Sequence, residues 1–233
     1  MAGIGIKLNK FFDKGTVTGY LAGSGYSVVT TIAPMLLVIA DILAMQKILG
    51  YSDAAYGSRQ LFQATILYIF VFALLASAPL NAVLSRYVSD VIFNETYSDI
   101  MAAFHLGLWI SMAIDAIMVV PFAIHEYIVG GVDIVYVVTS VCCFIALSLV
   151  FYTMLYLSLC KDYGKISLFY FIGMAITLGI SYIFVKKFNM EITYSMLLAM
   201  TIGFIIIASL GYALLRQYFT QNSKNYKDVL QYI

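Results

Sequence analysis

The sequence predicts an all-α integral membrane protein with six transmembrane helices. Of its 233 residues, 63% are hydrophobic and 11% are charged, against about 25% charged in an ordinary soluble domain. Between Lys14 and Arg216, five stretches of 20 to 27 residues contain no Asp, Glu, Lys or Arg. A helix needs about 20 apolar residues to cross a bilayer. A sixth stretch, 100–125, is interrupted only by Asp115.

The length of these stretches favours helices over barrel strands. A membrane-spanning β-strand has about 10 residues of alternating polarity, whereas these stretches are continuously apolar and at least twice as long. The predicted spans are 19–45, 60–85, 99–122, 134–159, 165–185 and 191–216.

Two shorter segments flank the six-span lobe, which we place at 15–218. Residues 1–14 predict an amphipathic helix at the cytoplasmic interface, with Ile4, Leu8, Phe11 and Phe12 on its apolar face. Residues 219–233 are polar and then helix-like, and we expect them to be a cytoplasmic linker.

The distribution of basic residues indicates the orientation. With the N-terminus inside, nine Lys and Arg residues fall in the expected cytoplasmic segments and four in the outside segments. Because short cytoplasmic loops are enriched in basic residues, both termini are expected on the cytoplasmic side of the inner membrane.

Pro34 lies in the middle of the first predicted span and Pro79 near the end of the second. Proline removes a helical hydrogen bond, so each helix is expected to bend. Gly19, Gly23 and Gly25 also lie in the first span, where small residues allow close helix contact. The glycines together with Pro34 therefore indicate either close helix contact or a mobile, bent first helix.

Ionisable residues inside a bilayer are costly and are candidates for function. Asp115 lies deep in the third span and Asp41 in the outer part of the first. Each carboxyl group could bind and release a proton or Na⁺, or could bond to Ser, Thr or Tyr of a neighbouring helix. His105 precedes Asp115 by ten residues and is either a proton relay or a satisfied polar contact.

Charged residues near the ends of spans suggest roles other than ion binding. Arg86 and Asp90 are spaced i, i+4 after the second span, which suits helix anchoring or a gate that opens and closes. All thirteen Lys and Arg residues lie at span ends, in loops or in tails. Buried basic groups that would bind a lipid pyrophosphate are thus absent, which favours a neutral or cationic substrate.

Tyr and Phe total 35 residues. Most are expected in the interfacial belt or in helix packing, but some could stack on sugar rings in a cavity. The candidates for sugar stacking are Tyr68, Tyr152, Tyr156 and Tyr170.

No motif for hydrolysis, nucleotide binding or zinc binding is present, so we expect no enzyme activity, metal or cofactor, and no nucleic-acid partner. His105 and His125 are not spaced as metal ligands. Cys142, Cys143 and Cys160 are interpreted as small packing residues.

Five segments form an ordered pattern along the chain. They are MAGIGIKLNKFF at the N-terminus, TIAP at 31–34, LSRYVSDVIF at 84–93, LSLCKDYGKISLFYFIG at 157–173 and LLRQYF at 214–219. Together and in this order they resemble segments of the PelG family of inner-membrane Pel exopolysaccharide exporters. The sequence departs from the family pattern at Ile6, Lys7, Asn9 and Ala33.

The resemblance implies membership of the flippase superfamily that includes multidrug and lipid-oligosaccharide transporters. Such proteins have about twelve spans in two six-helix lobes around a substrate cavity. This chain resembles the first lobe, so we expect a truncated or split product that needs a second six-span lobe. Implied partners are the bilayer, a cytoplasmic glycosyltransferase and regulatory membrane subunits of a Pel-like synthase complex.

Three functions remain open from the sequence. The first is export of an amino-sugar exopolysaccharide in biofilm formation, as half of a two-lobe transporter. The second is a lipid-linked oligosaccharide flippase or a cation-coupled drug antiporter. The third is a membrane scaffold that binds a polysaccharide synthase and transports nothing.

Overall fold

The computed structural model describes residues 17–94, 98–159 and 163–219, and within these ranges the side chains of all residues except 17–31, 92, 159 and 163. The described part is helical and contains no strand. Its long helices are α2 (Val17–Ile48), α3 (Tyr56–Phe93), α4 (Asp99–Ile128), α5 (Ile134–Leu159), α6 (Tyr163–Phe188) and α7 (Ile192–Tyr218). The predicted helix at 1–14 and residues 220–233 of the predicted linker lie outside the described residues.

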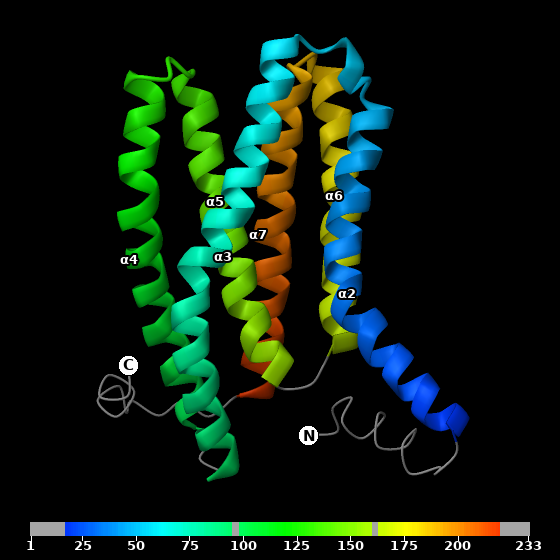
Figure 1. Cartoon of the computed structure of the whole chain (residues 1–233), viewed down its shortest axis with the longest axis vertical. Coiled ribbons are helices and arrows are strands. Elements are labelled where there is room, and N and C mark those ends of the chain that lie inside the picture. Colours follow the sequence, from blue (N-terminus) through cyan, green and yellow to red (C-terminus); the bar gives the residue numbers. More distant parts are fainter. Residues whose placement is uncertain (1–16, 95–97, 160–162, 220–233) are drawn as a thin grey trace.

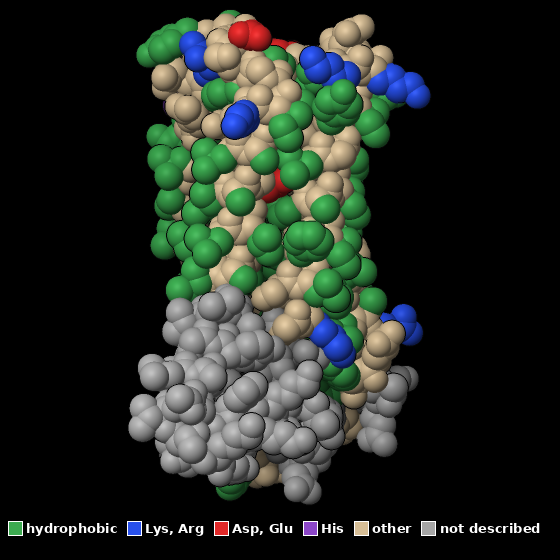
Figure 2. Space-filling view, turned by 90° about the vertical axis from the view of Figure 1, so that its right-hand side faces the viewer, with side chains coloured by type: hydrophobic (Ala, Val, Ile, Leu, Met, Phe, Trp, Pro, Cys, Tyr) green, Lys and Arg blue, Asp and Glu red, His purple; other side chains and the backbone are tan. Residues whose placement is uncertain are grey.

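Five of the helices, α3 to α7, are long and apolar enough to cross a membrane. The first predicted span falls on α2, whose side chains before Ile32 are outside the described part. The chain is therefore a multi-pass membrane protein in contact with lipid. A hydrophobic surface runs between groups of Lys and Arg side chains in the view of Figure 2.

Several helices extend beyond the predicted spans. α3 has 38 residues, about 57 Å at 1.5 Å per residue, and α2 has 32. The sequence predicts a loop from residue 86, but α3 continues to Phe93 and projects past the other helices (Figure 1). A helix can continue into the interface because water and headgroups satisfy its polar side chains, so the charged Arg86 does not end it.

Successive helices alternate in direction, so α2 begins and α7 ends at the same end of the bundle (Figure 1). We call this the proximal end, and the end that holds the connections 49–55, 129–133 and 189–191 the distal end. At the distal turn after α2, Gly50 adopts φ +70°, a conformation that glycine accommodates without strain.

The short helix η1 (Tyr51–Asp53) lies in this distal turn. Tyr51 packs edge-on against Phe62, and its hydroxyl donates a hydrogen bond to the main-chain oxygen of Arg59 at 2.9 Å. Burial raises the pKa of the Tyr51 hydroxyl, and the charge of Arg59 opposes this only in part. Tyr51 therefore stays a neutral hydrogen-bond donor at physiological pH.

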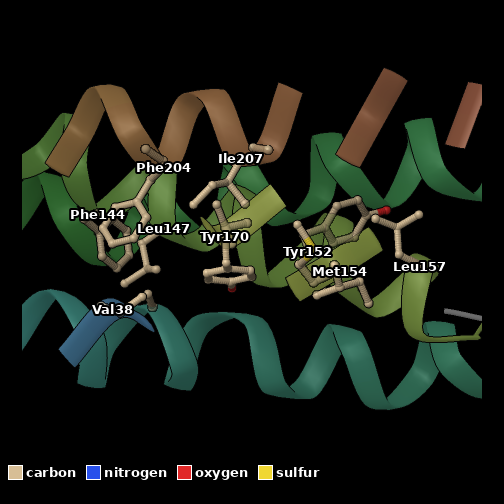
Figure 3. Packing of buried hydrophobic residues seen from close by; sticks show 14 of the residues in the cluster. Val38, Phe144, Leu147, Tyr152, Met154, Leu157, Tyr170, Phe204 and Ile207 are labelled. Atoms are coloured by element: carbon tan, nitrogen blue, oxygen red, sulfur yellow. The ribbon is translucent and has the colours of Figure 1, made fainter. Parts of the chain in front are cut away.

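α5 and α7 form the centre of the bundle. α7 packs against α5 and α6, α2 packs against α6, and α4 packs against α5 and α3 (Figure 1). The buried side chains of the core come from several helices and interdigitate along α5 and α7, as Figure 3 shows for Phe144, Leu147, Tyr170, Phe204 and Ile207.

Glycines allow α6 and α7 to approach closely. A Cβ atom on Gly203 would overlap Oγ1 of Thr177, and a Cβ atom on Gly173 would overlap the Ile207 side chain. Membrane helices associate through such small residues, because lipid provides little hydrophobic driving force. This contact holds α6 on the central helix.

Three helices contain an internal proline. Pro34 lies in α2, Pro79 in α3 and Pro121 in α4. The first turns of α2 are angled away from the rest of the helix (Figure 1), as expected when a proline ring displaces the preceding turn.

Candidate functional site

The packing of α4 changes at its middle. Its buried residues Phe104, Gly107, Ser111 and Asp115 recur every three or four positions, which places them on one helical face. No α4 residue beyond Asp115 is buried, and Ile117 is 74% exposed. The proximal half of α4 thus packs on the bundle, whereas the distal half separates from it.

Asp115 marks this transition. Its side chain is 1% exposed, and neither carboxylate oxygen has a hydrogen-bond partner among the described residues. Ser148 on α5 faces the carboxyl group without reaching hydrogen-bond geometry, and its hydroxyl is also buried without a partner. The two carboxylate oxygens of Asp115 and the hydroxyl oxygen of Ser148 thus lie between α4 and α5 with unused hydrogen-bonding capacity. Such an arrangement suits the binding of a proton or a small cation.

One helical turn beyond Asp115, a cavity of about 480 Å³ opens between α3, α4 and α5. Most of its lining is apolar, and it includes Met118 and Val119 from α4 and Phe144 from α5. Across it, the Tyr136 hydroxyl of α5 donates to the Thr65 hydroxyl of α3 at 3.3 Å.

Aromatic rings form part of the cavity wall. Phe122 packs edge-on against Tyr68, with ring centroids 5.9 Å apart, and also contacts Phe72. Of the four tyrosines predicted as sugar-stacking candidates, Tyr68 lines this cavity and is 48% exposed.

The other three candidate tyrosines are buried in helix contacts. Tyr152 and Tyr156 are 0% and 1% exposed, and their hydroxyls lie 3.3 Å apart. Tyr170 is also buried, within the core shown in Figure 3. In this conformation these rings contact protein, so a role in sugar stacking would require the helices to separate.

His105 lies near the proximal end, at a contact between α4 and α7. Its Nε2 atom is 3.4 Å from the hydroxyl of Tyr212, whose ring stacks on Phe104. Ten residues separate His105 from Asp115, about 15 Å along α4. The structure therefore does not bring the two side chains into contact.

Asp41 occupies a separate position on α2. It lies on a buried stripe with Val38 and Met45, is 3% exposed, and neither carboxylate oxygen has a hydrogen-bond partner among the described residues. Since α2 packs on α6 whereas α4 packs on α3 and α5, Asp41 and Asp115 belong to different helix contacts.

Arg86 and Asp90 are both exposed on the last turns of α3, one turn apart on the same helix face. Their role as an anchor or a gate remains a prediction, as does a role for Pro34 in a mobile first helix.

Among the described residues, no group of three or more His, Cys, Asp or Glu side chains could hold a metal ion. Cys142 is exposed and Cys143 is buried, each as a free thiol, and Cys160 lies outside the described residues.

Four further residues are not singled out by the sequence prediction above. They are Ser148, the cavity-lining Glu126 and Pro121, and Gly107 on the buried face of α4. Ser148 lies in an apolar run in which no polar pattern distinguishes it. Pro121 was detectable, because a proline inside a predicted span indicates a bend in the helix.

Comparison with known families supplies the identity. The whole chain, residues 1–233, matches the family described as "PelG: Putative exopolysaccharide Exporter (EPS-E)". The chain belongs to the PelG family. No curated protein and no solved structure matches it. Membership of PelG, which agrees with the resemblance in the sequence, implies a membrane transporter for exopolysaccharide rather than an enzyme.

Proposed function

We propose that this PelG protein moves an amino-sugar exopolysaccharide across the cytoplasmic membrane, as one lobe of a two-lobe transporter. The observation that carries the proposal is the family match over residues 1–233. The bundle of long apolar helices supports it, because a polymer that leaves the cell needs a protein-lined route through the bilayer.

In this proposal both termini are cytoplasmic and the proximal end faces the cytoplasm. The second lobe is supplied by another six-span segment, in the same polypeptide or in a partner. A cytoplasmic glycosyltransferase makes the polymer, and regulatory membrane subunits complete the complex. The basic side chains of the described residues lie toward helix ends, which suits a neutral or cationic polymer better than a lipid pyrophosphate.

Asp115 and Ser148 are the proposed ion-coupling site. Ionisable side chains inside a bilayer often mark ion or proton pathways. In this proposal Asp115 binds a proton or cation when the contact between α4 and α5 is closed, and releases it when water enters. Asp41 is a second candidate for the same role on α2, and His105 could deliver protons at the proximal end.

Two other functions, a different kind of transporter and a synthase scaffold, are possible for the same bundle of helices. Buried carboxyl groups without partners also suit a cation-coupled drug antiporter or a lipid-linked oligosaccharide flippase. Export of polyspecific cationic dyes from proteoliposomes would favour the antiporter. The third function, a scaffold for the synthase, requires no transport.

A deletion of the gene tests the proposal. In the deletion strain, secreted amino-sugar polymer should disappear, while isolated membranes supplied with the sugar nucleotide still make polymer. Loss of polymer synthesis in those membranes would favour the scaffold, and normal secretion would contradict the proposal.

A further inference from the structure

The distal half of α4 contacts its neighbours too little to bury its own residues. From Ile117 to Ile128 it exposes large apolar side chains, and Pro121 removes one of its hydrogen-bond donors. The cavity of about 480 Å³ lies where this half of α4 separates from α3 and α5. A ligand in the cavity would therefore complete the packing of α4.

The lining of the cavity defines the chemistry of a ligand. Side chains from all three helices are mostly apolar, and the polar lining residues include Thr65, Tyr136 and Glu126. Glu126, two residues before the end of α4, is the charged residue among them. Its side chain is 33% exposed, and its Oε1 atom lies 3.4 Å from Nδ1 of His125. The ligand should thus have an apolar body and an uncharged or cationic polar end near Glu126.

The length of the cavity fits one leaflet of a bilayer. Eight residues separate Glu126 from Met118, about 12 Å along α4. One leaflet contributes half of a hydrocarbon core of about 30 Å. A cavity of about 480 Å³ also falls within the range of about 300–1,000 Å³ typical of ligand sites.

We propose that this cavity binds one acyl chain of a membrane phospholipid, whose amine-bearing headgroup lies against Glu126. A cation is attracted to the carboxylate, whereas an anionic headgroup is repelled by it. The surrounding lipid is the source of the ligand, since the cavity lies among helices that cross the membrane. The end of the acyl chain lies beside Met118 and Val119, one turn from Asp115.

Matched tryptophan substitutions test the binding of the acyl chain. Ala123 lines the cavity, whereas its neighbour Ile124 is 53% exposed and does not line it. The full chain is extracted in mild detergent, incubated with vesicles of equal parts phosphatidylethanolamine and phosphatidylglycerol, and analysed by native mass spectrometry. We expect one bound phospholipid in the wild type and in Ile124→Trp, and none in Ala123→Trp.

A second variant fills the cavity from the opposite wall. Ala64→Trp on α3 should also remove the bound lipid, and it replaces Ala123→Trp if that variant is not monodisperse. Unchanged lipid binding in the cavity-filling variants would overturn the proposal. Loss of the lipid in Ile124→Trp, or co-purification of a polypeptide in place of lipid, would also overturn it.

The headgroup is tested separately. The wild type should retain phosphatidylethanolamine in preference to phosphatidylglycerol, and Glu126→Gln should remove that preference while keeping a bound lipid. Equal retention of the two lipids by the wild type would contradict the role of Glu126. Because the readout is bound mass, failure of polymer transport would leave these results intact.

Discussion

The hydroxyl of Tyr152 on α5 donates a hydrogen bond of 2.7 Å to the main-chain oxygen of Phe104 on α4. Gly107, one turn along α4, makes this approach possible, because a Cβ atom there would overlap the Tyr152 hydroxyl. The same Cβ atom would lie 2.7 Å from Cδ1 of Leu84 on α3. The proximal half of α4 is therefore fixed at a junction of three helices, whereas no described residue of its distal half beyond Asp115 is buried.

Gly107→Ala should destabilise the protein by about 1–3 kcal/mol, since the added methyl group overpacks this junction. Thermal unfolding in detergent measures the effect. Gly179→Ala is the matched control, because nothing lies within 4 Å of a Cβ atom at Gly179 in α6. An equal loss of stability in both variants would show that the junction is not specifically tight.

Gly203→Ala should loosen the contact between α6 and α7, because its methyl group would overlap Thr177. Thr177→Ala removes the overlapping hydroxyl and also loses its hydrogen bond to Gly173, which costs about 1 kcal/mol. The double variant should therefore be more stable than the sum of the two single losses predicts. Strictly additive losses of unfolding free energy would contradict this contact.

Asp115→Asn should abolish polymer secretion without lowering the amount of protein in the membrane. Asparagine keeps the size of the side chain but cannot bind and release a proton. Secreted amino-sugar polymer and membrane protein are measured in the same cells. Asp53→Asn, an exposed acid in the distal turn, is the control and should secrete normally. Normal secretion by Asp115→Asn would remove this residue from ion coupling.

Cysteine labelling tests the orientation. Ser52→Cys at the distal turn and Gln217→Cys at the end of α7 are introduced after Cys142, Cys143 and Cys160 are replaced by alanine. Both introduced positions are exposed. A membrane-impermeant maleimide should label Ser52→Cys in intact cells and Gln217→Cys only after lysis. Labelling of both sites in intact cells would contradict the proposed orientation.

The helices could be predicted because continuous apolar runs leave few other structures in a bilayer. Their ends were less predictable. α3 passes Arg86 and continues to Phe93, because polar residues can extend a helix beyond the hydrocarbon.

Helix contacts could not be predicted, since helices that are apolar on all sides give no signal for the buried face. Asp115 was singled out by its charge alone, but its position opposite Ser148 and beside a cavity depends on the register of α4 against α5. Tyr152 and Tyr68 look alike in sequence, yet one is buried at a helix junction and the other lines the cavity.

Transport by this chain is tested most directly in inside-out membrane vesicles that contain it together with its synthase complex. Supplied with a radiolabelled amino-sugar nucleotide, these vesicles should accumulate polymer that an added glycoside hydrolase cannot reach. Vesicles without the chain should make polymer that the hydrolase degrades fully. Equal protection of the polymer with and without the chain would contradict its role as an exporter.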